Sequence, residues 1–377
     1  MEGSMNWAGL LADILLSISG RLTDPKDFIS FRAVCPQWRH AIKRTAHARF
    51  PPWILKSEEV GVSGNVLFYS PSSEKYQEIH VPALKGRRTR LAGFGAGHLI
   101  GVDADDDLSA VLVNPLTGET AALPRLPERF HGAITFGFAT DPAMAGDEDV
   151  SVVVYNWWPA AGNVRIHVAL WRRRGGREGW TTLPSERFWA RMPEQRSRLV
   201  SSDDGRQVLE DDDEQAAVAG QGDMEMQWVP GMEGVHLMEH EGKVRFVSRV
   251  EGNAFVVQSP GTPPRPLVAF ELHGVLGDDD DDGNWAAVDW ADAPELRDKV
   301  ILQSADSCCH VLPASDAACA GLSKNCIYFL DWQRIGEAQV YCLCKWDFLQ
   351  RVATFVKEIP GDWDWNIGRW FLPTLKY

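Results

Sequence analysis

The feature that most constrains the fold is a series of short apolar runs that fills the chain after residue 60. Each run is rich in β-branched and aromatic residues and is bounded by Gly, Pro, Asn or Asp. Examples are GNVLFYS (64–70), AVLVNP (110–115), VSVVVYNWW (150–158), KVRFVSRV (243–250) and NCIYFLD (325–331). Runs of this length and composition predict β-strands. Few helical patterns lie between them, so we predict a mainly β domain over residues 53–377.

Strand-like runs that end in an apolar residue and a proline recur along this domain. The prolines are Pro82, Pro124, Pro184, Pro230, Pro313 and Pro360. Their spacings are 42, 60, 46, 83 and 47 residues, and the longest becomes two units if Pro266 marks another run. A period of about 45 residues is the length of a four-stranded propeller blade. The spacing favours a β-propeller of six or seven degenerate blades, although kelch-type and WD-type signatures do not recur.

An open arc of blades would expose strand edges at both of its ends. Propellers commonly avoid this when one terminus completes the blade that the other terminus begins. The C-terminal run RWFLPTL (369–375) is apolar and strand-like. We therefore predict that it pairs with the strand near WILKS (53–57) and closes the ring.

Residues 1–50 differ from the rest, because their apolar residues follow helical spacing. The apolar side of a first helix is formed by Leu11, Ile14, Leu15, Ile18 and Leu22. A second helix is predicted to start at Asp24-Pro25, a typical helix start, with an apolar side formed by Phe28, Phe31, Val34 and Cys35. A third is predicted to start at Pro36 and to present Trp38, Ala41, Ile42 and Thr45.

The charge of the chain also divides near residue 50. Residues 1–50 hold seven Lys or Arg against four acidic residues, whereas the remainder holds 31 basic and 48 acidic residues. Pro51-Pro52 cannot continue a helix, so we predict two domains, residues 1–50 and 53–377. A large acidic domain argues against nucleic-acid binding. No apolar run approaches the length of a membrane span, and we expect no membrane association.

A unit of about 45 residues is too small to cover this many apolar side chains alone. Some of its surface is expected to pack either on another protein or on the chain's own large domain. The residues do not distinguish these two alternatives.

The run LLADILLSISGRLTDPKDFISFRAVCPQWRHA (10–41) resembles an F-box. The pairs Val34-Cys35 and Trp38-Arg39 carry the resemblance, and Leu11-Ala12 departs from it, because the family usually has Leu-Pro there. The resemblance implies docking onto the Skp adaptor of a cullin–RING ubiquitin ligase. The implied adaptor-binding residues are Leu10, Leu11, Ile14, Leu15, Ile18, Val34, Cys35 and Trp38.

The large domain resembles the KIB-type β-propeller of plant F-box proteins. The motifs that carry this are NPLTGETAALPRLP (114–127), GLSKNCIYFLD (321–331) and RWFLPTL (369–375). Together the resemblances imply the substrate receptor of an SCF-type E3 ubiquitin ligase, nuclear and/or cytoplasmic, whose propeller binds a target protein. The alternative is a propeller enzyme or carbohydrate-binding protein with an incidental helical N-terminus.

The sequence does not match the motifs of dinucleotide, calcium or zinc sites. We therefore predict no catalytic residues, cofactor or metal. GFGAGHLIG (93–101) lacks the dinucleotide-binding spacing and is predicted to be a glycine turn before a strand. The acidic runs 103–107, 210–214 and 278–282 lack calcium-loop spacing and are predicted to be loops at blade edges. The cysteines predicted to be core thiols rather than zinc ligands or a nucleophile are Cys308, Cys309, Cys326, Cys342 and Cys344.

Candidates for target binding are the aromatic and basic residues around 157–174. Exposed Trp and Arg are common anchors of protein interfaces. The candidates are Trp157, Trp158, Arg172, Arg173 and Arg174. The alternative is a hairpin loop with one Trp in the core.

Overall fold

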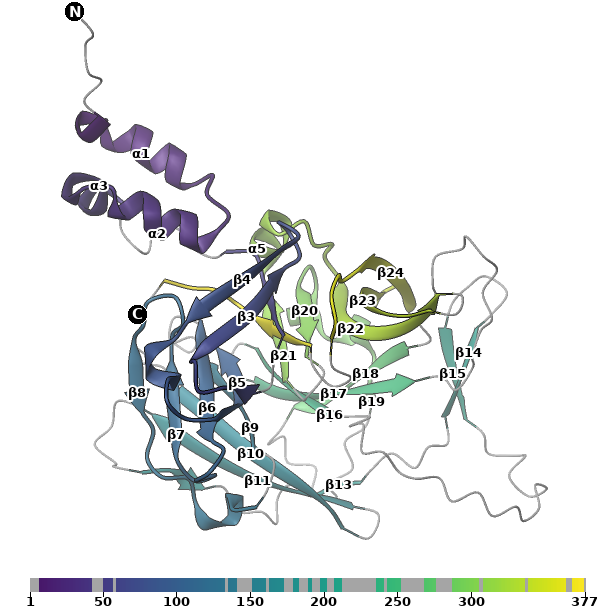
Figure 1. The fold of residues 1–377 in the computed structure, drawn as a ribbon. Coiled ribbons are helices and arrows are strands. Elements are labelled where there is room, and N and C mark those ends of the chain that lie inside the picture. The colour runs from purple at the N-terminus through teal and green to yellow at the C-terminus, as the bar shows by residue number, and fades with distance from the viewer. Residues whose placement is uncertain are drawn as a thin grey trace, which may run out of the picture.

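The computed structural model describes residues 7–42, 50–56, 59–132, 135–140, 151–160, 163–172, 179–182, 189–191, 197–201, 207–211, 235–240, 243–251, 268–275, 287–304, 308–335, 338–363 and 368–375. The chain is mainly β, with short helices at the N-terminus and curled sheets after them (Figure 1). This confirms the predicted helical unit followed by a mainly β domain. None of the helices in the described part of the chain has the length and apolar character needed to cross a membrane.

Three helices form the N-terminal unit: α1 (Ala12–Ser19), α2 (Pro25–Ala33) and α3 (Pro36–Ala41). The predicted helix starts are confirmed. Asp24 caps α2 because its carboxylate accepts a hydrogen bond from the backbone N–H of Lys26 at 2.8 Å. Pro25 and Pro36 stand in the first turn of α2 and α3, where a missing N–H leaves no hydrogen bond unmade.

The first sheet joins the two ends of the large domain. Its strands are β1 (Trp53–Leu55), β3 (Asn65–Ser70), β4 (Lys75–His80) and β25 (Arg369–Phe371). They lie in the order β25-β1-β3-β4, and β25 pairs antiparallel with β1, with Trp370 opposite Ile54. The predicted pairing of RWFLPTL with WILKS is therefore confirmed.

The second sheet contains two antiparallel groups. Its strands are β2 (Glu59–Val60), β5 (Thr89–Gly95), β6 (His98–Asp103), β7 (Ala110–Val113), β8 (Thr120–Ala122), β9 (Phe136–Thr140), β10 (Ser151–Ala160), β11 (Asn163–Arg172), β12 (Thr181–Thr182) and β13 (Trp189–Arg191). The groups meet where β5 and β9 run parallel, with Gly93 opposite Gly137. A Cβ at Gly93 would lie 1.7 Å from the carbonyl oxygen of Gly137, so this approach requires glycine.

The glycine-rich run 93–101 is the β5–β6 hairpin. Ala96 and Gly97 form its turn with φ angles of +49° and +74°. The predicted glycine turn before a strand is confirmed.

The third sheet holds most of the C-terminal half. Its strands are β16 (Val235–His240), β17 (Lys243–Glu251), β18 (Val268–Val275), β19 (Ala287–Val288), β20 (Val300–Gln303), β21 (Cys308–Leu312), β22 (Cys326–Ile335), β23 (Ala338–Asp347) and β24 (Val352–Glu358). Parallel pairings again join its antiparallel groups, β16 with β21 and β20 with β22. A separate hairpin is formed by β14 (Ser197–Ser201) and β15 (Gln207–Asp211). The remaining elements are α5 (Ala314–Cys319) and the 3₁₀ turns η1 (Trp7–Gly9), η3 (Pro82–Leu84), η4 (Glu128–Phe130), η6 (Trp290–Asp292) and η7 (Pro294–Leu296).

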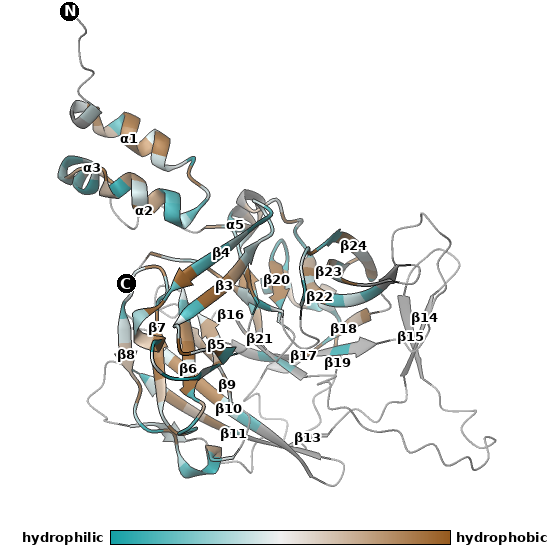
Figure 2. Cartoon of the chain, in the orientation of Figure 1, coloured by the Kyte–Doolittle hydropathy of each residue, from teal (hydrophilic) through white to brown (hydrophobic). Residues whose placement is uncertain are grey.

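Hydrophobic residues lie along the strands of these sheets and along α1 (Figure 2). One buried cluster crosses the closing seam and joins the first sheet to β5–β7 and β20–β23. At the seam, the ring of Phe68 lies 5.5 Å from that of Trp53 and 4.9 Å from that of Phe371. The two chain ends therefore share one core.

Candidate functional site

The N-terminal helices carry an exposed apolar surface. Ten large hydrophobic side chains are exposed among the described residues, and six of them lie between residues 7 and 34. The six, which we call the helical apolar face, are Trp7, Leu11, Ile14, Leu16, Ile18 and Val34. The helical unit is a small part of the chain, so this enrichment is high, and such apolar surfaces mark interaction sites.

Helical periodicity produces this face on α1. Leu11, Ile14 and Ile18 are spaced by three and four residues, so they lie on one side of the helix. Leu11 is 70% exposed. Leu15 borders the same stripe, but it turns inwards and is 1% exposed. The apolar residues of α1 are thus divided between a solvent-facing side and a packed side.

The packed side of the helices forms a small core with residues of the large domain. Its buried members are Leu15, Phe28, Trp38, Ile42, Phe50 and Leu375, which we call the helical core. Leu375 and the partly buried Leu116 come from the large domain, and within the helical unit the ring of Phe28 meets that of Phe50 edge-on at 5.7 Å. The unit therefore packs its inner side on its own chain and leaves its outer side to solvent.

The structure separates the eight residues predicted to bind an adaptor. Leu11, Ile14, Ile18 and Val34 are exposed. Leu10 and Cys35 are half-buried, whereas Leu15 and Trp38 belong to the helical core. The first group is available to a partner, and the last pair holds the helices together. Trp7 and Leu16 are further exposed residues of the helical unit that the sequence did not single out, and Leu16, two residues from both Ile14 and Ile18, lies on another side of α1.

The residues predicted to bind a target are not brought together. Trp157 and Trp158 lie on β10, where they pair with Ile166 and Arg165 of β11. Arg172 is exposed at the other end of β11, opposite Ser151. Six residues separate Ile166 from Arg172, which is about 20 Å along a strand. Arg173, Arg174 and the side chains of both tryptophans lie outside the described residues.

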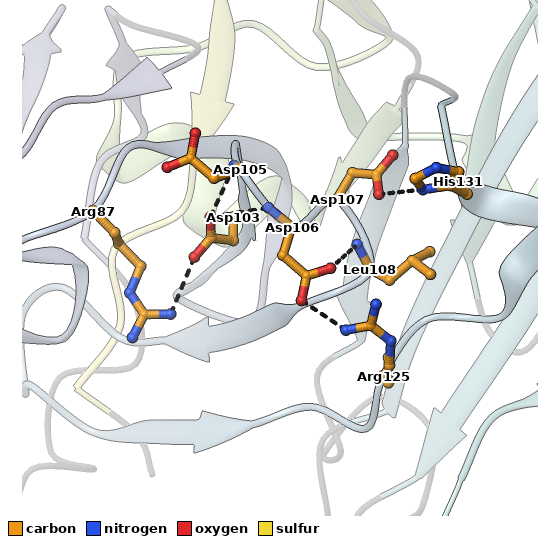
Figure 3. A network of polar contacts seen from close by, with 8 residues as sticks. All are labelled: Arg87, Asp103, Asp105, Asp106, Asp107, Leu108, Arg125 and His131. Atoms are coloured by element: carbon orange, nitrogen blue, oxygen red, sulfur yellow. Dashed lines mark hydrogen bonds and ion pairs between the residues drawn. The ribbon is translucent and has the colours of Figure 1, made fainter.

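The acidic run 103–107 forms the loop between β6 and β7 (Figure 3). The Asp103 carboxylate accepts hydrogen bonds from the backbone N–H groups of Asp105 and Asp106. Arginines pair with two of its acids, Arg87 with Asp103 at 3.4 Å and Arg125 with Asp106 at 2.6 Å, and the Nδ1 atom of His131 lies 2.8 Å from the Asp107 carboxylate. The hydrogen bond from Arg125 lowers the pKa of Asp106. The predicted loop is confirmed, and it is held by its own ion pairs.

The other acidic runs lie largely outside the described residues; only Glu210 and Asp211 of the second are described, at the end of β15. Across the described part of the chain, no group of three or more His, Cys, Asp or Glu is arranged to hold a metal ion.

Four cysteines of the large domain have described side chains, and all four are buried thiols. Burial raises the pKa of Cys326 to about 11 and that of Cys342 to about 12, and it also raises the pKa of Cys344. Cys309 is buried as well, whereas the side chain of Cys308 lies outside the described residues. Protonated, buried thiols are poor nucleophiles, so the core assignment is confirmed for these four.

Comparison with known proteins covers the large domain. A family model described as KIB1-4 beta-propeller matches residues 68–346. The match runs from within β3 almost to the end of β23, and this confirms the predicted propeller; the number of blades stays a prediction. The match does not include the helices or the closing strand β25. A search of curated proteins found no match.

Proposed function

The chain belongs to the KIB1-4 β-propeller family, and from this premise we propose that it is the substrate receptor of an SCF-type E3 ubiquitin ligase. A propeller of this type supports a role in protein interaction. In our proposal the helices dock on the Skp adaptor and the propeller binds a target protein. The chain performs no bond chemistry. It raises the effective concentration of target lysines near the conjugating enzyme that the ligase carries.

The helical apolar face is the observation that supports this proposal most strongly. Its residues remain exposed although the other side of the same helices is packed on the propeller. Four of them, Leu11, Ile14, Ile18 and Val34, are positions that the F-box resemblance assigns to the adaptor. If the chain were a propeller enzyme or a carbohydrate-binding protein, the exposure of these apolar side chains would have no explanation. We therefore favour the Skp adaptor as its occupant.

A double change, Ile14→Asp with Ile18→Asp, tests the proposal. Burial of each Ile against a partner contributes roughly 1.5–3 kcal/mol, and an unpaired carboxylate in the interface adds a further penalty. We expect adaptor affinity to fall more than about a hundredfold in a pull-down or titration with the purified adaptor. The thermal melt of the propeller should not change, because both side chains are exposed.

The matched control is Val62→Asp, which places the same charge at an exposed valine of the propeller. It should leave adaptor binding intact. Leu15→Ala serves as a second reference, because it weakens the helical core without adding charge to the face. If the Ile14→Asp, Ile18→Asp variant binds the adaptor as the wild type does, the proposed function is wrong.

A further inference from the structure

We propose that closure of the propeller ring orders the adaptor-docking helices, so that only a closed propeller presents the helical apolar face. The link is the segment Leu372–Leu375, which we call the strap. It follows the closing strand β25 directly and ends in the helical core. The structural coupling stands on contacts within the chain; only its meaning for adaptor docking rests on the proposed function.

The strap begins at β25, a strand that is held by contacts with three different segments of the chain. β25 pairs with β1, the guanidinium of Arg369 donates to the carbonyl oxygen of Leu91, and the backbone N–H of Trp370 donates to the hydroxyl of Ser304 at 3.0 Å. The position of β25 therefore depends on β1, β5 and the residue after β20, which come from distant parts of the sequence. Only a closed ring provides all three contacts.

The strap then crosses two turns of the second sheet. The side-chain amide of the buried Asn114 donates to the carbonyl oxygen of Thr374 at 3.1 Å. A Cβ at Gly97 would lie 2.0 Å from the side chain of Thr374, so a residue with a side chain there would displace the strap. Burial alternates along the segment, with Phe371, Pro373 and Leu375 buried. This pattern indicates that the strap packs in one defined position, with every second residue facing inwards.

The strap ends among apolar residues of the helical unit. Leu375 is 3% exposed and belongs to the same buried cluster as Leu15, Phe28 and Trp38. Leu116, in the turn that Asn114 caps, packs against both this cluster and the cluster at the closing seam. The two cores are thus in contact through one leucine and joined through one continuous strap. In Figure 1 the yellow C-terminal segment runs from β25 to the side of the propeller that carries the helices.

Polar contacts connect the helices to the same closed sheet. The side-chain amide of Gln77, on β4, donates to Asp24 at 2.8 Å, while Asp24 also caps α2. The ammonium group of Lys26 donates to the carbonyl oxygen of Glu78, also on β4, at 2.9 Å. The start of α2 is therefore held by the sheet that β25 completes.

These contacts couple the two regions by the same free energy in both directions, but the consequences are unequal because the helical unit is the less stable of the two. If β25 leaves β1, the strap can no longer hold Leu375 in place, and the helical core loses one of its six buried members. A unit this small has a low free energy of unfolding, so the loss of one buried side chain matters. The helices should therefore loosen when the ring opens, whereas loosening of the helices removes no strand from the ring.

Leu375→Asp tests the coupling, with Leu349→Asp as the matched control. Leu349 is 53% exposed in the turn after β23, so the same substitution there buries no charge. Hydrogen exchange is measured for amides of α1–α3 and of β22–β23 in the full chain. We expect Leu375→Asp to speed exchange in the helices by about 30-fold or more, with β22–β23 still protected. Leu349→Asp should change neither region.

The outcomes separate the coupling from the proposed function. Unchanged exchange in the helices of Leu375→Asp overturns the coupling. Equal loss of protection in the helices and in β22–β23, both in Leu375→Asp and in the milder Leu375→Ala, also overturns it, because Leu375 would then be an ordinary part of the propeller core. If the wild type shows no adaptor binding but Leu375→Asp loosens only the helices, the coupling holds and the proposed function fails.

Discussion

The helical unit and the propeller complete their cores in different ways. The propeller closes on itself, since its last strand pairs with its first and the rings of Trp53, Phe68 and Phe371 meet across the seam. The helical unit needs Leu375 of the large domain to complete its core and leaves six large apolar side chains exposed. The much larger propeller exposes only four among its described residues.

The difference in exposed apolar surface bears on which part of the chain binds a partner. Single exposed apolar side chains are normal on the surface of a folded domain, so the four on the propeller need no special explanation. The three-helix unit, by contrast, still exposes several large apolar side chains after its core has formed. The contrast therefore supports our proposal that the helices, rather than the closed ring, dock on the adaptor.

Removal of the closing strand should have the largest effect. A chain that ends after Pro360 lacks β25 and with it Trp370 and Phe371, both of which are fully buried. Loss of one large buried aromatic side chain destabilises by about 3–5 kcal/mol, against a typical total of about 5–15 kcal/mol. We expect insoluble protein, because β1 also becomes an open edge. A soluble truncation with a cooperative thermal melt would show that closure is dispensable.

Thiol labelling compares the two regions directly. Cys35 lies half-buried between α2 and α3, whereas Cys326 and Cys342 are buried in the propeller with pKa values raised to about 11 and about 12. The thiolate is the reactive form, so at a pH of about 8 only about one part in 10³ of Cys326 and one in 10⁴ of Cys342 is reactive. We expect iodoacetamide to label Cys35 at least about a hundredfold faster than Cys326 or Cys342, as measured by mass spectrometry of peptides.

The pH dependence provides the check on this explanation. Both raised pKa values lie above the labelling pH, so each unit of increase in pH should raise the thiolate fraction of Cys326 about tenfold until the pH approaches 11. In denaturant all three cysteines should react alike. Labelling of Cys342 as fast as that of Cys35 in native protein would mean that the propeller core opens readily.

The sequence predicted the regular elements because each has a local cause. Asp24-Pro25 is a cap with a proline in the first turn, and the structure has both. The apolar character of residues 369–375 and the need to cover strand edges predicted the closing strand, which pairs with β1 as expected. These inferences succeeded because capping, periodicity and edge pairing depend on few residues that lie close together or at chain ends.

Contacts between distant segments were not predictable in this way. Leu375 reads as the end of a terminal strand, and nothing in RWFLPTL shows that it joins the core of helices more than 330 residues earlier. The helical stripe on α1 placed Leu15 with Leu11 and Ile14, and only the packing of the unit shows that Leu15 faces inwards. The alternation of buried residues from Phe371 to Leu375 is visible only in the structure, because the run Phe-Leu-Pro-Thr-Leu does not itself alternate between apolar and polar residues.

A glycine pair inside the propeller offers a smaller perturbation than truncation. Gly93→Ala introduces a Cβ at the contact between β5 and β9, where the nearest backbone oxygen would lie 1.7 Å away. Overpacking of this kind typically destabilises by about 1–3 kcal/mol. Gly61→Ala is the control, because a Cβ there meets nothing within 4 Å. Chemical denaturation should show a lower midpoint for Gly93→Ala alone; equal midpoints would mean that the two strands separate at little cost.

The smallest expected effect is the loss of the cap on α2. Asp24→Ala removes both the hydrogen bond from the Lys26 backbone and the contact with Gln77 of β4. Cap removal costs about 0.5–2 kcal/mol, and the cost should fall on the helices, because the ring keeps every strand. Hydrogen exchange should therefore speed up in α2 and remain unchanged in β22–β23.

Asp27→Ala is the matched control for the cap. It removes an exposed carboxylate from the same first turn of α2, which keeps its cap and its contact with β4. A carboxylate near a helix N-terminus contributes about 0.3–1 kcal/mol through the helix dipole, so this variant should be the milder of the two. If Asp24→Ala speeds exchange in the propeller as much as in α2, the helices stabilise the ring, and the two regions are not separable as the comparison requires. If the effect stays in α2, the helices can loosen while the ring remains closed, as the comparison requires.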